Sequence, residues 1–128
     1  MEFSFIIILV ALIQYQAFGL RTGIARGKYA VPPPKCTVND TWERIFRVHQ
    51  NTMEQLVVFV PAQLLFSYYV SARWAILPGV AFLIARQTYS HMYLKNPMKR
   101  GFAFTFMINA VLVIGSLIGV IVSVVKAA

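Results

Sequence analysis

Apolar segments long enough to cross a membrane make up most of the chain. They cover approximately Phe3–Leu20, Gln55–Ala72, Trp74–Leu94 and Phe102–Val125. Each reaches or approaches the roughly 20 residues that an α-helix needs to span a hydrocarbon layer about 30 Å thick. The pattern predicts one all-α membrane domain over residues 1–128, in which four transmembrane helices form an up-down bundle.

Short polar signals indicate where these helices begin and end. Asn39, Asp40 and Thr41 supply N-capping side chains ahead of the second helix. The helices are expected over approximately residues 3–20, 41–70, 74–94 and 101–125. Pro61 is expected to kink the second helix midway. Residues 21–40 are expected to form a loop, because the run Pro32–Pro34 cannot be helical.

The basic residues are sorted by region. The net charge is +8, with 12 Lys and Arg against 4 Asp and Glu. Nine of the 12 lie in 21–47 or 95–100, whereas the opposite side holds only Arg73 and Lys126. The positive-inside rule therefore places both basic regions in the cytosol. We expect a multi-pass protein of a bacterial inner membrane or the endoplasmic reticulum, with a cytosol-facing site and no nucleic-acid partner.

The second helix begins with a stripe of polar side chains. Its members are three or four residues apart and so share one helix face: Arg47, Gln50, Asn51 and Glu54. The same line continues through apolar positions, so the stripe is expected to face the bundle interior one turn deeper: Val58, Pro61 and Leu65. Such groups are costly in a membrane helix unless they meet partners or a ligand. The stripe therefore predicts a site for a small zwitterionic or anionic molecule.

The third helix ends with a second polar face, formed by Arg86, Tyr89, Ser90 and Tyr93. Arg86 lies within apolar sequence and needs a carboxylate partner, for which Glu54 is the natural candidate. The two tyrosines are interpreted as a wall of the same site; the alternative is that they anchor the helix at the membrane interface.

Other polar residues leave more than one reading open. Arg26 and Lys28 are either anion contacts in the first loop or simple positive-inside charges. Gln14 either meets the polar stripe or hydrogen-bonds another helix. Asn109 predicts an interhelical hydrogen bond, and Gly115-x-x-x-Gly119 allows a close helix approach. No metal site is expected, because the possible ligands do not cluster: Cys36, His49 and His91.

The absence of familiar catalytic patterns leaves the chemistry to arginine and tyrosine. The sequence has no phosphate-binding loop, no paired carboxylates and no Ser-His-Asp arrangement. Arginine and tyrosine stabilise anions, and a thiolate is the anion that acts as a nucleophile. Lowering a thiol pKa of about 8.5 by about 2 units takes about 2.7 kcal/mol, which one guanidinium at a membrane interface can supply. A peptide-like thiol would place its amine on Glu54 and its carboxylates on Arg26, Arg47 and Arg86.

Three segments resemble a known family. The runs ARGKYAVPPP, ERIFRVHQNTMEQLVVF and ARQTYSHMYL, with an arginine shortly after the last, resemble the MAPEG superfamily of membrane-associated proteins in eicosanoid and glutathione metabolism. The resemblance extends over roughly residues 14–110. It implies a four-helix protomer in a homotrimer, with glutathione as co-substrate, no metal, and a cytosol-facing site between neighbouring subunits.

The resemblance also assigns roles to individual residues. Arg100 matches the arginine that activates the thiol, and is the expected catalytic residue. The other matches are glutathione contacts, with Gln50 corresponding more loosely: Arg26, Arg47, Gln50, Asn51, Glu54, Arg86, Tyr89 and Tyr93.

The expected function is that of a membrane-bound glutathione transferase with a role in detoxification. It would conjugate glutathione to lipophilic electrophiles and reduce lipid hydroperoxides as a side activity. One alternative is a non-catalytic scaffold that binds membrane lipid, and another is a glutathione-dependent prostaglandin E synthase-like isomerase. The isomerase is less favoured, because Gly101 and Phe104 stand where those enzymes have serine and tyrosine. A small drug exporter is least favoured, because that class needs an intramembrane acid to carry protons, and the only one here, Glu54, is expected to pair with arginines.

Overall fold

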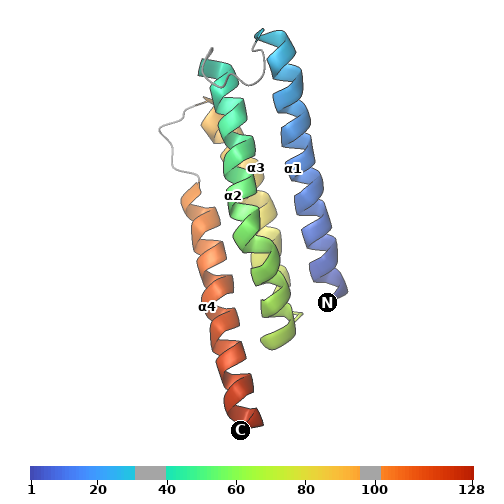
Figure 1. The fold of residues 1–128 in the computed structure, drawn as a ribbon, viewed down its shortest axis with the longest axis vertical. Helices are drawn as coiled ribbons and strands as arrows, with labels where there is room; N and C mark the ends of the chain where they lie inside the picture. The colour runs from blue at the N-terminus through green and yellow to red at the C-terminus, as the bar shows by residue number, and fades with distance from the viewer. Residues whose placement is uncertain (31–39, 96–101) are drawn as a thin grey trace.

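The computed structural model describes residues 1–30, 40–95 and 102–128, and these ranges are helical with no strand. The helices are α1 (Glu2–Lys28), α2 (Asp40–Tyr69), α3 (Ile76–Lys95) and α4 (Phe102–Ala127). They pack side by side, and both termini lie at the same end of the bundle (Figure 1). This is the up-down arrangement expected from the four apolar segments.

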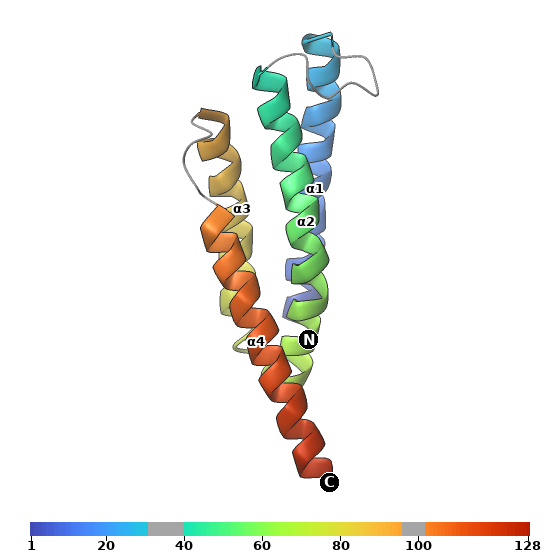
Figure 2. The same cartoon turned by 60° about the vertical axis from the view of Figure 1, so that its left-hand side comes forward.

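Helix α2 is the centre of the bundle. It contacts each of the other three helices, whereas α1 and α4 do not touch each other. After rotation the molecule shows α1 beside α2 and α3 beside α4 (Figure 2). Whether the polar stripe of α2 is accessible to a ligand therefore depends on how the other three helices pack around α2.

Helix α1 is longer than expected. It was expected to end near Leu20, but it continues to Lys28, so the expectation of a loop from residue 21 is wrong. No proline interrupts the sequence before Pro32, and Gly23 and Gly27 cost a helix only about 1 kcal/mol each. The added turns are held by packing, since Ala25 is buried against residues at the start of α2. Cations in the last turn also favour a helix C-terminus.

The membrane-spanning character is clearest for the two outer helices. In the described part of the chain, α1 and Phe104–Ala127 are long and apolar enough to cross a membrane. Helix α4 exposes apolar side chains along most of its length, as a lipid-facing helix would. Helices α2 and α3 do not meet the same criterion, since polar residues interrupt the apolar sequence of both. Spanning by these two helices therefore stays a prediction.

The apolar core contains residues from all four helices. Phe59 of α2 and Phe82 of α3 are fully buried and stack with their ring centroids 3.8 Å apart. The other buried members of this cluster are Ile7, Ile8, Ala11, Leu56, Ala62 and Leu112. The cluster holds the bundle together over the half that contains the termini.

Helices α2 and α4 approach closely at two glycines. A Cβ atom at Gly115 would lie 2.6 Å from Cε2 of Phe66, and one at Gly119 would lie 2.9 Å from Cγ2 of Val70 and 3.0 Å from the carbonyl oxygen of Tyr69. The predicted close approach is confirmed, and it occurs between two helices of the same chain.

Buried polar side chains join the helices at several levels. Asn109 donates from Nδ2 to Oε1 of Gln55 at 2.9 Å, which confirms the predicted interhelical hydrogen bond. Gln14 donates to the carbonyl oxygen of Leu83 at 3.2 Å, so it bonds α3 and not the polar stripe of α2. Gln63 is fully buried and donates to Ser4 and to the carbonyl oxygen of Ala75. The sequence analysis missed Gln63, because one amide in an apolar run gives no sign of its partners.

Candidate functional site

A polar pocket opens on the side of the bundle, between the first half of α2 and the last turns of α3. We call it the polar pocket; its volume is about 340 Å³. Its lining consists of Arg47, Gln50, Asn51, Glu54, Tyr89 and Tyr93. All six are predicted site residues, four from the stripe on α2 and two from the face on α3. The structure thus brings these two sequence patterns together.

The orientation of α2 explains why these side chains line a pocket. Val48 and Thr52 are fully buried on the inner side of the helix, and Val48 packs with Phe18 and Tyr89. Arg47, just before Val48, and Glu54, two residues after Thr52, are turned outward, and their side chains are exposed. The side of α2 that bears the stripe is therefore the one that the other helices of the chain leave open.

The expectation that the stripe continues into the bundle interior is wrong. The later positions on the same line are also exposed, with Val58 at 40% and Leu65 at 44%. The interior is filled instead by a neighbouring face of α2 that includes Phe59, Ala62 and Gln63. Helical spacing identifies residues that share a face, but it does not say which face the neighbouring helices cover.

Tyr89 and Tyr93 form one wall of the polar pocket. Their rings stack with centroids 5.4 Å apart and an interplanar angle of 24°. Tyr89 is buried and Tyr93 is half-buried, and both pack with Phe18 and Val48. Two tyrosines inside a packed cluster that also lines a pocket fit a site wall better than freely exposed interfacial anchors.

Arg86 lies behind the polar pocket and is not part of its lining. Its side chain is fully buried, and its Cζ atom is 4.3 Å from the centroid of the Tyr89 ring. The guanidinium donates to Oδ1 of Asn51 at 2.9 Å and to Oγ1 of Thr52 at 2.8 Å. A longer bond of 3.4 Å reaches Oγ1 of Thr105 in the first turn of α4.

The expected ion pair between Arg86 and Glu54 is wrong. Glu54 is exposed, and the partners of the Arg86 guanidinium in the described ranges are neutral oxygens of α2 and α4 together with an aromatic ring. Such neutral oxygens satisfy a buried guanidinium without a carboxylate, provided that several of them converge on it. Glu54 is thereby left to face the pocket.

Among the described residues, Arg26 is another predicted site residue that does not line the polar pocket. Arg26 lies in the last turn of α1, where its Cζ atom is 4.7 Å from the centroid of the Trp42 ring. Arg100, the expected catalytic residue, falls in 96–101 and so lies outside the described residues, as does Cys36.

A second polar cavity adjoins the first at the beginning of α2. Its volume is about 280 Å³, and it shares Arg47 and Tyr93 with the polar pocket. The remaining lining residues are Asp40, Glu43 and Arg44. The sequence analysis noted Asp40 as an N-capping residue only. Asp40, Glu43 and Arg47 are three and four residues apart, so the helical spacing could have shown that Asp40 and Glu43 continue the polar stripe.

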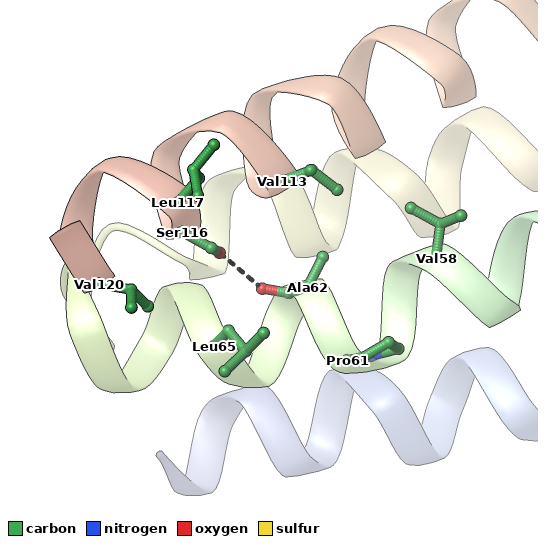
Figure 3. A pocket seen from close by; sticks show the side chains of 8 residues that line it. All are labelled: Val58, Pro61, Ala62, Leu65, Val113, Ser116, Leu117 and Val120. Carbon is green, nitrogen blue, oxygen red and sulfur yellow. Dashed lines mark hydrogen bonds between the residues drawn. The ribbon is translucent and has the colours of Figure 1, made fainter.

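An apolar groove runs along the same side of α2 toward the termini. It consists of two cavities of about 340 and 370 Å³ that share Val58 and Val113. The upper cavity is also lined by Gln55 and Asn109. Figure 3 shows the lower one, where Ser116 of α4 donates to the carbonyl oxygen of Ala62 and the other side chains drawn are apolar. We call this surface the α2–α4 groove.

The histidines have structural contacts away from the polar pocket. His49 stacks on Tyr15 of α1 with ring centroids 4.6 Å apart, and partial burial lowers the pKa of its ring below the ordinary value. His91 lies within 3.3 Å of the side chain of Gln87. Among the described residues no three potential metal ligands gather into a group.

The chemistry of the polar pocket suits a zwitterion with hydrogen-bonding groups. Arg47 offers a cation, Glu54 an anion, and Gln50 and Asn51 offer amides, all on one side of one helix. Two stacked tyrosines close the opposite side. The α2–α4 groove begins at Val58, one helical turn beyond Glu54, so an apolar molecule in the groove would lie next to a polar one in the pocket.

Comparison with known proteins gives consistent similarities. The sequence profile of the MAPEG family matches residues 4–120. The uncharacterised protein sll1147 of Synechocystis is 36% identical over 114 residues, which are 88% of this chain and 83% of that protein. Microsomal glutathione S-transferase 2 of Bos taurus is 30% identical over 84% of this chain and 75% of its own length. The human protein of the same name is 31% identical over 84% of this chain and 74% of its own length.

Proposed function

The chain belongs to the MAPEG family, and from this membership we propose that it is a membrane-bound glutathione transferase, which conjugates glutathione to lipophilic electrophiles. The observation that carries the proposal is the polar pocket, in which six side chains predicted to contact glutathione converge. The names of the mammalian relatives support the same reaction class.

Each part of glutathione has a complementary group in the polar pocket. Its amine pairs with the carboxylate of Glu54, and a carboxylate pairs with the guanidinium of Arg47. The amides of Gln50 and Asn51 meet the peptide groups, and the stacked rings of Tyr89 and Tyr93 cover one side. A flexible tripeptide gains affinity from such a site because several of its groups are held at once.

The reaction is the attack of the glutathione thiolate on an electrophilic carbon. Arg100 stabilises the thiolate, a carbon–sulfur bond forms, and the leaving group departs with the electron pair. The α2–α4 groove supplies a place for the apolar second substrate beside the polar pocket. With a lipid hydroperoxide, the thiolate instead attacks an oxygen, which releases an alcohol and leaves a sulfenate that a second glutathione converts to the disulfide and water.

The proposal includes a homotrimer whose sites face the cytosol. In the described ranges, Tyr89 and Tyr93 of α3 border the polar pocket on one side and Arg47 and Glu54 of α2 are exposed at it, which leaves room for a neighbouring subunit to complete it. Arg26, which is outside the pocket within one chain, would then be a contact contributed across a subunit boundary.

The proposal is tested by titrating the purified protein with glutathione while the absorbance of the thiolate is followed at neutral pH. We expect a saturable thiolate signal, and conjugation of a chlorodinitrobenzene with the same glutathione dependence. Glutathione binding without thiolate formation or conjugation would favour the non-catalytic scaffold. The absence of any saturable binding would refute the proposed function.

A further inference from the structure

The side-chain amide of Asn51 is hydrogen-bonded to Arg86, and this bond fixes its orientation. A guanidinium carries only donors, so the atom of Asn51 that lies 2.9 Å from Nη1 of Arg86 must be the acceptor oxygen. The carbonyl and amino ends of a side-chain amide point in different directions. Since the oxygen is directed at the buried guanidinium, the amino group remains for the pocket that Asn51 lines. The amide has no other hydrogen bond within the part of the chain that the structure describes.

Arg86 is itself held in place from several sides. It is fully buried, its second amino group donates to Oγ1 of Thr52, and its plane lies over the Tyr89 ring at 4.3 Å. Thr52 has a further bond to the carbonyl oxygen of Val48 at 2.7 Å. The guanidinium thus has a defined direction, and a side chain that bonds to it inherits that direction.

We propose that Arg86 is a positioning residue of the glutathione site: from the buried side it holds the Asn51 amide so that its amino group is presented to the polar pocket as a hydrogen-bond donor. This inference rests on the proposed function, and it replaces the expectation that Arg86 contacts glutathione directly. It assigns Asn51 to an acceptor on the ligand, either a carboxylate or a peptide carbonyl. Without Arg86 the amide is free to rotate and to present its oxygen instead.

The two terminal nitrogens of the Arg86 guanidinium have different partners, since Nη1 donates to Asn51 and to Thr105, whereas Nη2 donates to Thr52. The bond to Asn51 determines the polarity of the pocket wall, and the longer bond to Thr105 reaches the first turn of α4. A lysine at this position keeps the charge, but one ammonium group does not reproduce the planar fork. The proposal therefore predicts that charge alone is insufficient.

A double-mutant cycle in glutathione binding tests the proposal. Affinities are measured by calorimetry for the wild-type protein, Arg86→Gln, Asn51→Ala and the double variant. We expect each single variant to bind glutathione at least tenfold more weakly, and the double variant to bind no more weakly than Asn51→Ala. Additive losses would overturn the proposal, because Arg86 would then act independently of Asn51. Arg86→Lys is also expected to lose at least tenfold, and wild-type affinity in that variant would overturn the role of the fork.

Asn51→Asp tests the same assignment without altering the core, and so does not depend on whether Arg86→Gln folds. The aspartate still accepts from Arg86, but it presents an oxygen to the pocket where the amino group was. We expect an unchanged or higher melting temperature together with at least a tenfold loss of glutathione affinity. Undiminished affinity would overturn the proposal.

A control separates this role from general stability. Gln63→Ala removes the hydrogen bonds of a fully buried amide that lines neither the polar pocket nor the α2–α4 groove, and it should lower the melting temperature with no change in glutathione affinity. If the wild-type protein itself does not bind glutathione, the proposed function fails. If it binds and the cycle is additive, only the role of Arg86 fails.

Discussion

The side chains of the site are of two kinds. Some line the polar pocket and face a ligand, and others lie behind the pocket and hold the lining side chains in place. Glu54 and Arg47 are exposed at the pocket, whereas Arg86 and Thr52 are fully buried behind it. Loss of a group of the first kind removes one contact with the ligand. Loss of a group of the second kind also leaves buried donors or acceptors unpaired, which costs about 1–3 kcal/mol for each group.

Replacement of Glu54 by glutamine should weaken glutathione binding. The exposed carboxylate is the only anion lining the polar pocket, and it is assigned to the glutathione amine. An exposed charge pair contributes up to about 1 kcal/mol, so the dissociation constant should rise about fivefold, as measured by calorimetry. Glu2→Gln, at the distant N-terminus of α1, is the control and should bind as the wild type does. An unchanged affinity for Glu54→Gln would remove its assignment to the amine.

Replacement of Arg100 by alanine should affect turnover more than binding. If the guanidinium lowers the thiol pKa from about 8.5 by about 2 units, its removal lowers the thiolate fraction at neutral pH, and with it kcat, about 25-fold. The dissociation constant of glutathione should stay within about threefold of the wild-type value, since the side chain acts on the thiolate. Lys99→Ala removes a neighbouring cation and serves as the control. Equal losses of binding and rate would identify Arg100 as a ligand anchor, and undiminished turnover would favour the scaffold alternative.

Helices α2 and α4 determine the architecture around the site through their mutual approach. The two helices touch where glycines of α4 meet Phe66, Tyr69 and Val70 of α2. The α2–α4 groove runs beside this contact, since its lower cavity is lined by residues 113–120 of α4, and it continues past the contact to Gln55 and Phe106. Small residues promote such contacts between membrane helices, because lipid offers little apolar driving force for association.

Gly119→Ala should destabilise the bundle, and Gly23→Ala should not. A methyl group at Gly119 meets the backbone of Tyr69, which cannot move aside without displacing the helix. We expect a loss of about 1–3 kcal/mol in the free energy of unfolding in detergent. Gly23 has open space around it, so alanine there should stabilise α1 by about 0.5–1 kcal/mol through helix propensity. If Gly119→Ala and Gly23→Ala changed the free energy of unfolding by the same amount, the close contact of α2 with α4 would not contribute to stability.

Val58→Phe should impair the use of large apolar substrates. Val58 lines both cavities of the α2–α4 groove, so a larger side chain there fills the space where they meet. We expect KM for a long-chain electrophile to rise about tenfold, since about 1–3 kcal/mol of apolar contact is lost, while glutathione affinity is unchanged. Val125→Phe, exposed near the end of α4, is the control. If KM for the long-chain electrophile is unchanged in Val58→Phe, the apolar substrate binds elsewhere.

Over the described ranges the bundle gathers exposed charges at the polar pocket, while most exposed side chains of α1 and α4 are apolar. Apolar side chains are exposed along α1 and α4, and the polar pocket opens at the opposite end from the termini. Exposed charges such as Arg47 and Glu54 are costly next to lipid and need water or another subunit beside them. This arrangement favours an assembly in which α2 faces a neighbouring copy.

Native mass spectrometry of the protein released from mild detergent should therefore detect three copies of the chain. The trimer is expected to persist on dilution, since the uncovered side of α2 has no other partner in the described ranges. A stable monomer that conjugates glutathione at the normal rate would contradict both the trimer and the shared site. A monomer without activity would agree with a site that needs the neighbouring subunit.

The sequence by itself determined the helices and the residues that share their faces. Apolar length and the three-and-four spacing are local properties, so they predicted the helical bundle and both polar faces that meet at the pocket. The length of α1 was misjudged, because its extra turns are held by contact with the start of α2, which is far away in sequence.

Only the tertiary structure decided which faces are covered and which groups pair. It turned the α2 stripe outward, buried Arg86 behind the polar pocket, and gave that guanidinium Asn51 and Thr52 in place of Glu54. Helical periodicity specifies an angle around one axis, but burial and pairing depend on how the axes of different helices are placed relative to one another. That placement follows from packing of the whole bundle, in which neutral oxygens of Asn51, Thr52 and Thr105 accept from the two terminal nitrogens of the Arg86 guanidinium in place of a carboxylate.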